Sequence, residues 1–171
     1  MKSAVVVGNP KAKSRTLDAG ILVAQKLSGR MPDVVIDVID LGADLLEFGN
    51  ARVAAAIQSI QGMDFVVFAS PTYKATYTGL LKLFLDQVPQ NGLLDITSFA
   101  VMLGAGPAHA MAPDLLLKPV LVELGAVCPA AGLYLIDKSF AEDPRLDAWV
   151  ARAKQSLRKI VTPSQDSMRT D

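Results

Sequence analysis

The residues best suited to chemistry lie in three polar segments, each of which follows a short apolar run. The first, residues 8–16 (GNPKAKSRT), leads into a helical pattern and carries hydroxyl and cationic side chains: Ser14, Thr16, Lys11, Lys13 and Arg15. A helix start offers unpaired N–H groups and a partial positive charge, so this combination favours binding of a phosphate group. The alternative interpretation is an ordinary capped turn with solvated lysines. The segment lacks the ending of a Walker motif and the partner glycines of a dinucleotide fingerprint.

The other two segments have the composition to hold a flat ring. Residues 70–79 (SPTYKATYTG) combine aromatic rings, hydroxyls and backbone amides, which can hydrogen-bond the edge of a heterocycle. Alternatively, they form a polar cap over a sheet, with Tyr77 packing sideways. Residues 104–109 (GAGPAH) are small enough to let a ring approach the backbone closely. The chain's only histidine, His109, ends this segment, and we interpret it as a helix-start or surface residue rather than a proton-transfer group.

Catalytic groups of the usual kinds are missing from the sequence pattern. Ala69, Ser70 and Pro71 stand where a phosphoacceptor receiver domain needs an aspartate. There is no Gly-x-Ser-x-Gly elbow, and the one histidine and one cysteine are far apart without a recognisable local signature. No cluster of His, Cys and Asp has metal-ligand spacing, so we expect no metal. A bound cofactor that carries its own chemistry fits this composition.

The elements that must position these segments alternate between strands and helices. Short apolar runs predict five strands, at residues 3–8, 34–39, 65–69, 99–103 and 133–136. Apolar residues spaced three or four apart predict helices at residues 16–27, 51–61, 79–88, 114–124 and 144–160. This alternation predicts an α/β, flavodoxin-like three-layer sandwich whose five-stranded parallel sheet has the order 2-1-3-4-5. Ligands of such sheets bind beyond the carboxyl ends of the strands, where all three segments would lie.

Length and composition limit the class of protein. The 171 residues are 51% apolar and 20% charged, with 17 Lys and Arg against 17 Asp and Glu. This balance disfavours a nucleic-acid partner and a membrane surface. A single cysteine, Cys128, is consistent with a reducing cytoplasm. We therefore expect a soluble cytoplasmic protein, with one domain over residues 1–162 and a disordered tail at 163–171.

In these segments the sequence resembles the NADPH-dependent FMN reductase family. The family's phosphate loop is matched by Gly8, Pro10, Ser14, Arg15 and Thr16. Its ring loop and the helix after it are matched by Pro71, Tyr73, Lys74, Ala75, Tyr77, Gly79, Leu81, Lys82, Leu85 and Asp86. Its third pattern is matched by Gly104, Ala108, His109, Leu117 and residues 118–121 (KPVL). The resemblance spans residues 3–137 in the correct order, and the middle motif is the most specific. The most similar branch comprises the reductases that supply reduced FMN to two-component monooxygenases, such as those that desulfonate organosulfonates.

The resemblance implies FMN and NAD(P)H as cofactors and hydride transfer from the nicotinamide C4 to the flavin N5. The protein would hold both rings at reacting distance and exclude water, without a catalytic residue of its own. The residues implied to bind cofactor are Asn9, Lys11, Ser14, Arg15, Thr16, Pro71, Thr72, Tyr73, Lys74, Ala75, Gly104, Ala105, Gly106 and His109. Asn9 and Lys11 replace a common serine and arginine, and Ala105 replaces a frequent glycine. Leu115 stands where some sulfonate-linked members have an aromatic residue, which leaves the sub-branch open.

The resemblance also implies a homodimer or homotetramer and a transient transfer of reduced flavin to a monooxygenase. The helix at 79–88 supports an oligomer independently, because its apolar residues cover more than one face: Leu80, Leu81, Leu83, Phe84, Leu85 and Val88. The alternative for this helix is extra burial under a loop.

Three other functions stay open. A flavin-bound quinone or azo reductase of the same superfamily would share these motifs. A non-enzymatic electron carrier of the flavodoxin type is usually strongly acidic and has a T-x-T-G-x-T phosphate loop, and this chain has neither property. A flavin-free binding or scaffold domain on the same fold is the remaining alternative.

Overall fold

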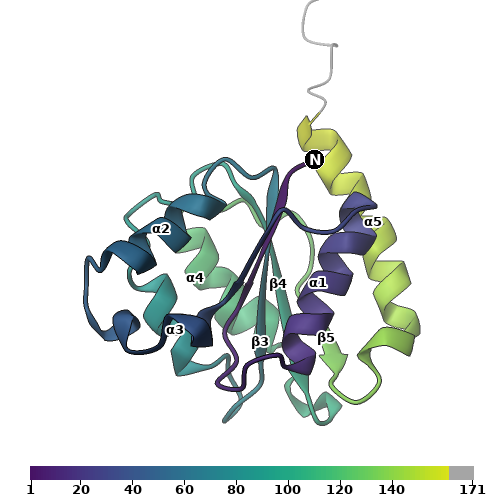
Figure 1. The fold of residues 1–171 in the computed structure, drawn as a ribbon. Coiled ribbons are helices and arrows are strands. Elements are labelled where there is room, and N and C mark those ends of the chain that lie inside the picture. The colour runs from purple at the N-terminus through teal and green to yellow at the C-terminus, as the bar shows by residue number, and fades with distance from the viewer. Residues whose placement is uncertain (162–171) are drawn as a thin grey trace, which may run out of the picture.

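Five parallel strands form one sheet in the centre of the structure (Figure 1), a computed structural model that describes residues 1–161 and, in its last helix, side chains up to residue 157. The strands are β1 (Ser3–Val7), β2 (Val34–Asp37), β3 (Phe65–Pro71), β4 (Thr97–Gly104) and β5 (Leu133–Ile136). They are ordered β2-β1-β3-β4-β5, and all four neighbouring pairs are parallel. The order predicted from the sequence is therefore confirmed. The predicted tail at 163–171 lies outside the described residues.

Helices cover both faces of this sheet (Figure 1). One face carries α1 (Arg15–Ser28) and α5 (Pro144–Val161), and the other carries α2 (Ala51–Ile60), α3 (Gly79–Leu85) and α4 (Lys118–Glu123). Because both faces are covered, strands such as β1 and β3 are buried at every position. Alternate residues of β1 point to opposite layers: Val5 and Val7 pack with α1 and α5, whereas Ala4 and Val6 pack with the other helices. No helix within the described part of the chain is long and apolar enough to cross a membrane.

Two predicted elements differ from the observed ones. The strand predicted at 34–39 ends at Asp37 and is followed by the 3-10 segment η1 (Val38–Leu46), which is interrupted at Gly42 by a positive φ of 56°. The single helix predicted at 114–124 is a π-helical turn, η3 (Pro113–Leu117), followed by α4. Pro119 has no backbone N–H to donate to the residue four positions earlier, which explains why regular α-helical bonding is broken there.

The apolar excess of α3 is largely buried within the chain itself. Leu81, Phe84, Leu85 and Val88 are all buried, and they share one core cluster with Leu41 and Leu45 of η1. Leu80 and Leu83 are only partly buried. The segment η1 was not predicted from the sequence, so its cover over α3 was not anticipated. Less of α3 is therefore free to contact a second chain than the sequence alone suggests.

The first turn of α3 packs directly against the end of β1. A Cβ atom added to Gly8 would lie 2.2 Å from the Cβ of Leu81, so only glycine fits there. The hydroxyl of Thr78 donates a hydrogen bond to the Gly8 carbonyl at 2.5 Å and accepts one from the Leu81 N–H at 3.1 Å. The Thr78 N–H in turn donates to the Ser70 hydroxyl at 3.0 Å. This buried network joins the end of β1, the end of β3 and the start of α3.

Replacing Thr78 with valine should lower the free energy of unfolding by about 1–3 kcal/mol. Valine keeps the shape but leaves the buried Gly8 carbonyl and the Leu81 N–H without their partner. Urea denaturation measures this loss. The matched control is Thr78→Ser, which keeps the hydroxyl and should lose less than half as much. Equal stability of the Val variant and the native chain would show that this network does not stabilise the fold.

Candidate functional site

A pocket of about 450 Å³ opens where the carboxyl ends of β1, β3, β4 and β5 meet. Its volume is within the range of small-molecule sites, roughly 300–1,000 Å³. All three sequence-predicted segments contribute to it. Its lining is Asn9, Lys11, Lys13, Ser14, Arg15, Thr16, Asp18, Pro71, Thr72, Tyr73, Leu103, Gly104, Ala105 and Asp137. We call this space the main pocket.

The first segment is held by hydrogen bonds from its own buried side chains. The amide of Asn9 accepts a bond from the Lys11 N–H at 2.9 Å and donates one to the Thr16 hydroxyl at 2.9 Å. Ser14 is the N-cap of α1, and its hydroxyl accepts from the Leu17 N–H at 3.2 Å. Lys13 has a positive φ of 51°, which turns the chain into the helix. The start of α1 is therefore fixed beside the main pocket.

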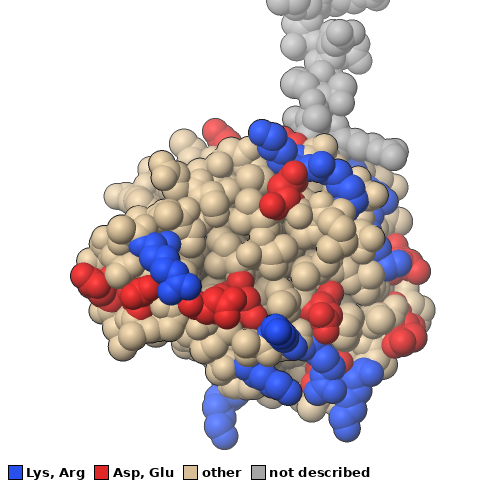
Figure 2. Space-filling view, viewed as in Figure 1, with Lys and Arg blue, Asp and Glu red and all other residues tan. Residues whose placement is uncertain are grey.

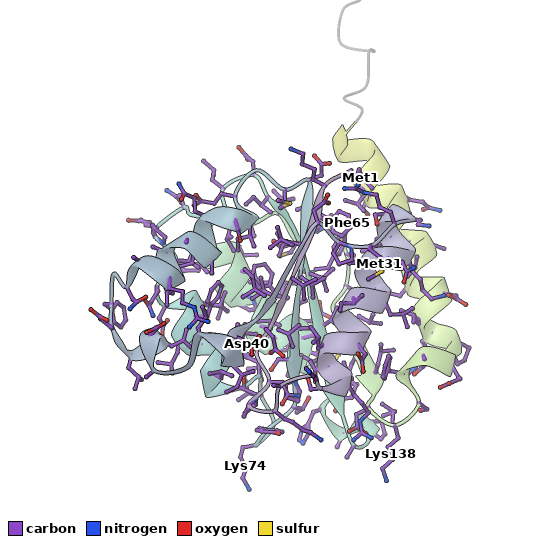
Figure 3. All side chains as sticks on the ribbon, in the orientation of Figure 1. Met1, Met31, Asp40, Phe65, Lys74 and Lys138 are labelled. Atoms are coloured by element: carbon purple, nitrogen blue, oxygen red, sulfur yellow. The ribbon has the colours of Figure 1, made fainter. Side chains whose placement is uncertain are left out.

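Charges are unevenly distributed around this edge of the sheet. The Arg15 guanidinium pairs with the Asp137 carboxylate at 2.8 Å. Four exposed lysines have no ion-pair partner among the residues that the structure describes: Lys11, Lys13, Lys74 and Lys138. Figure 2 shows basic side chains along the lower edge of the molecule, and Figure 3 shows Lys74 and Lys138 projecting from it. An edge of this kind attracts anions.

One buried carboxylate lies behind the first segment. Asp37, at the end of β2, is 9% exposed and accepts a hydrogen bond from the Lys13 N–H at 3.3 Å. Burial raises the pKa of the Asp37 carboxyl, and the bond from Lys13 lowers the pKa in part. This contact ties the left-handed Lys13 to the neighbouring strand.

The second segment contains a tight hairpin turn at residues 73–76. The Tyr73 N–H donates to the Thr76 carbonyl at 2.9 Å, and the Thr76 N–H donates back to the Tyr73 carbonyl at 3.2 Å. The two residues between them, Lys74 and Ala75, have positive φ angles of 51° and 71°. Glycine or asparagine is usual in such a turn, and non-glycine residues in this region store of the order of 1 kcal/mol each. The turn holds Tyr73, which is 52% exposed, at the rim of the main pocket.

The third segment is held in place by Tyr134 of β5. A Cβ atom added to Gly104 would lie 1.8 Å from the Tyr134 hydroxyl oxygen, so this position requires glycine. The same hydroxyl donates a hydrogen bond to the Gly106 carbonyl at 3.0 Å. Sequence reasoning missed Tyr134, because a tyrosine in a buried apolar strand resembles any other core aromatic. The sequence did offer one signal: a tyrosine in a buried strand needs a hydrogen-bond partner for its hydroxyl, so it was a candidate to hold a nearby loop.

A second pocket of about 310 Å³ continues from the main pocket over this third segment. The two pockets share Thr72, Gly104 and Ala105, and the second adds residues 106–109 and Tyr134. The Thr72 hydroxyl is buried and has no hydrogen-bond partner within the described part of the chain. Together the pockets form one cleft with a polar, cationic end and an end lined by small residues.

The structure brings most of the predicted site residues into this cleft. Ten line the main pocket: Asn9, Lys11, Ser14, Arg15, Thr16, Pro71, Thr72, Tyr73, Gly104 and Ala105. Gly106 and His109 line the continuation, and Ala75 lines a neighbouring apolar pocket with His109. Lys74 is absent from the lining of both pockets, and it projects from the lower edge of the molecule (Figure 3). Sequence reasoning did not include Asp18, Leu103 and Asp137.

The cleft offers hydrogen-bond donors, cations and close backbone approach. Among the residues described, no group of three or more His, Cys, Asp or Glu side chains could hold a metal ion. The arrangement is suited to binding an elongated ligand with an anionic group at the start of α1 and a flat group at the third segment.

Comparisons with known proteins agree with this geometry. Residues 1–141 match the family described as NADPH-dependent FMN reductase. The NADH-dependent FMN reductase SfnF of Pseudomonas fluorescens is 29% identical over 83% of this chain and 80% of its own length. An NADPH-dependent FMN reductase of Pseudomonas putida is 33% identical over 78% of this chain and 70% of its own. The apo structure of an NADH:FMN oxidoreductase superposes with a TM-score of 0.80, at 28% identity, over 98% of this chain and 94% of its own.

Proposed function

Since this chain belongs to the NADPH-dependent FMN reductase family, we propose that it is an NAD(P)H:FMN oxidoreductase whose FMN binds along the cleft. The observation that carries the proposal is the continuity of the two pockets. One end of the joined pockets is the start of α1, which is suited to an anion, and the other end is a surface of small residues. The joined pockets lie along the edge of the sheet formed by the ends of β1, β3, β4 and β5. FMN has the same order of parts, with a phosphate at one end and a flat ring at the other.

The residues at the start of α1 fit a phosphate group. The hydroxyls of Ser14 and Thr16 and the first N–H groups of α1 are donors, and Lys11 and Lys13 add positive charge at the rim. Asn9 does not need to touch the ligand to contribute, because its amide already holds Thr16 and the Lys11 backbone. These residues support the assignment of this end of the cleft to the phosphate.

The residues of the second and third segments fit the ring. Tyr73 and Thr72 border the cleft on one side, and Gly104, Ala105 and Gly106 provide a backbone surface with almost no side chains. The buried Thr72 hydroxyl, which has no partner within residues 1–157, would gain one from a polar atom of the ligand. Tyr134 fixes the third segment through the Gly106 carbonyl, so the surface is formed before the ligand binds.

Bound FMN supplies the position that accepts hydride from the reduced nicotinamide. The chain's own residues bind the phosphate, orient the flavin against the backbone of residues 104–106 and leave its exposed side open to the nicotinamide. The turn at residues 73–76 forms the wall next to the ring and limits the access of water. The lysines along this edge attract both substrates, which are anions.

We further propose, on the resemblance of its motifs, that the reduced FMN passes to a partner monooxygenase and that the chain forms a homodimer or homotetramer. Because α3 is largely buried, the surface that supports an oligomer is instead the segment at residues 111–122, which follows the third segment. Met111, Leu115 and Val122 are 59%, 64% and 53% exposed there.

An oligomer should be detected by light scattering at micromolar concentration as a mass of two or four chains. Replacing the exposed Leu115 and Val122 with lysine should shift that mass toward one chain, because charges would face the apolar interface. Replacing the exposed Val35 of β2 in the same way is the control and should leave the mass unchanged. A native mass of one chain would contradict the oligomer.

The reaction itself should be visible as oxidation of NADPH or NADH at 340 nm that depends on added FMN. Each nucleotide is tested with FMN, with riboflavin, and with FMN plus a quinone. A rate that needs only FMN supports the flavin reductase. A rate that appears only when quinone is added would favour the quinone reductase instead. If neither nucleotide is consumed after FMN is added, the proposed oxidoreductase activity is wrong.

Ser14→Ala should weaken the binding of FMN but not of riboflavin. A hydrogen bond to a charged group contributes roughly 1.5–3 kcal/mol, so the FMN dissociation constant should rise about tenfold to a hundredfold. Riboflavin carries no phosphate, so its dissociation constant should stay the same. The ratio of the two dissociation constants, measured by quenching of flavin fluorescence, isolates the phosphate contact from general damage.

The matched control for Ser14→Ala is Asn50→Ala. Asn50 caps α2 by accepting a bond from the Arg52 N–H at 2.9 Å, and it lies on the opposite face of the sheet. Both variants lose a helix cap, which costs about 1 kcal/mol of stability. Only the Ser14 variant should change the ratio of FMN to riboflavin affinity. An unchanged ratio in that variant would leave Ser14 with a capping role alone.

A further inference from the structure

We propose that Asp137 binds a hydroxyl group of the ribityl chain of the flavin through its Oδ1 atom. This inference rests on the proposed binding of FMN along the cleft. It adds a residue that contacts neither the phosphate nor the ring, and that determines the affinity for any flavin with a polyol chain.

The backbone places Asp137 beside the middle of the cleft. It follows β5 directly, and its N–H donates a hydrogen bond to the Gly104 carbonyl at 3.0 Å. Gly104 is shared by both pockets, as is Thr72 on its other side. Asp137 therefore contacts both the start of α1, through Arg15, and the first residue of the third segment, Gly104.

The two oxygens of the Asp137 carboxylate have different surroundings. Oδ2 accepts a hydrogen bond from the Arg15 guanidinium at 2.8 Å, which fixes the orientation of the group. Oδ1 is buried and has no hydrogen-bond partner anywhere in residues 1–157. A carboxylate oxygen accepts hydrogen bonds and a buried one without a donor is costly, so this atom calls for a donor from a ligand in the main pocket.

Of the three parts of FMN, the ribityl chain has suitable donors for this position. A phosphate is an anion that a carboxylate repels, and it fits the donors of Ser14 and Thr16 instead. The ring fits the small residues 104–106. The ribityl chain connects the two and carries hydroxyl groups, which donate well to a carboxylate. Asp137 contacts both the helix start and the third segment, just as the polyol connects the phosphate to the ring.

The test compares three flavins that differ by one part each: FMN, riboflavin and lumiflavin, which lacks the ribityl chain. Their dissociation constants are measured by fluorescence quenching without any nicotinamide, so that a sugar hydroxyl of the nucleotide cannot contribute. In Asp137→Ala, riboflavin should bind about tenfold to a hundredfold more weakly, and lumiflavin should change less than twofold. FMN should lose less than riboflavin, because Arg15 is freed and a negative charge near the phosphate is removed.

Two variants separate this contact from general effects of charge. Asp147→Ala removes a carboxylate that pairs with Lys26 of α1 at 2.8 Å outside the main pocket, and it should leave the ratio of riboflavin to lumiflavin affinity unchanged. Asp137→Asn keeps the size of the side chain and one acceptor oxygen, so it should show a smaller loss in the same direction. It also serves if the alanine variant does not fold, which thermal melting would reveal.

Three outcomes would overturn the assignment. If Asp137→Ala leaves the ratio of riboflavin to lumiflavin affinity as it is in the native chain, Asp137 does not bind the polyol. If only FMN binding weakens, Asp137 acts through Arg15 on the phosphate. If the native chain binds no flavin at all, the proposed function fails together with this inference, and that result differs from the other two.

Discussion

The close packing of α3 against Gly8 is the constraint on which the site depends. A side chain at this glycine would collide with Leu81, and the Thr78 hydroxyl bonds to the glycine's own carbonyl. The end of β1 is therefore held against the start of α3, which follows directly from the hairpin turn after β3. The first and second segments, more than fifty residues apart in the sequence, become two walls of one pocket.

The far end of the cleft depends on a similar contact at β5. Gly104 leaves room for the Tyr134 hydroxyl, which holds the Gly106 carbonyl, while the Asp137 N–H holds the Gly104 carbonyl. The cleft is thus held together by hydrogen bonds from side-chain hydroxyls and an N–H group to backbone carbonyls, none of which takes part in chemistry. This agrees with a family in which the cofactor supplies the chemistry, and the protein supplies orientation and an edge rich in cations.

The sequence predicted the fold and most of the cleft, because alternating strands and helices define the topology and the three segments follow strands directly. It did not predict η1, because residues 38–39 were assigned to the preceding strand and Gly42 interrupts the segment. It therefore overestimated the free surface of α3. It also missed Tyr134 and Asp137. Both belong to β5 and its end, about thirty residues beyond the third segment, and only the sheet brings them to the cleft.

The most direct test of this account is a crystal structure of the chain with FMN. We expect phosphate oxygens within about 3.2 Å of the Ser14 or Thr16 hydroxyl or of the first N–H groups of α1. We also expect the ring to lie between residues 72–75 and residues 104–109. A phosphate bound away from the start of α1, or a ring outside these two segments, would contradict the assignment of the cleft.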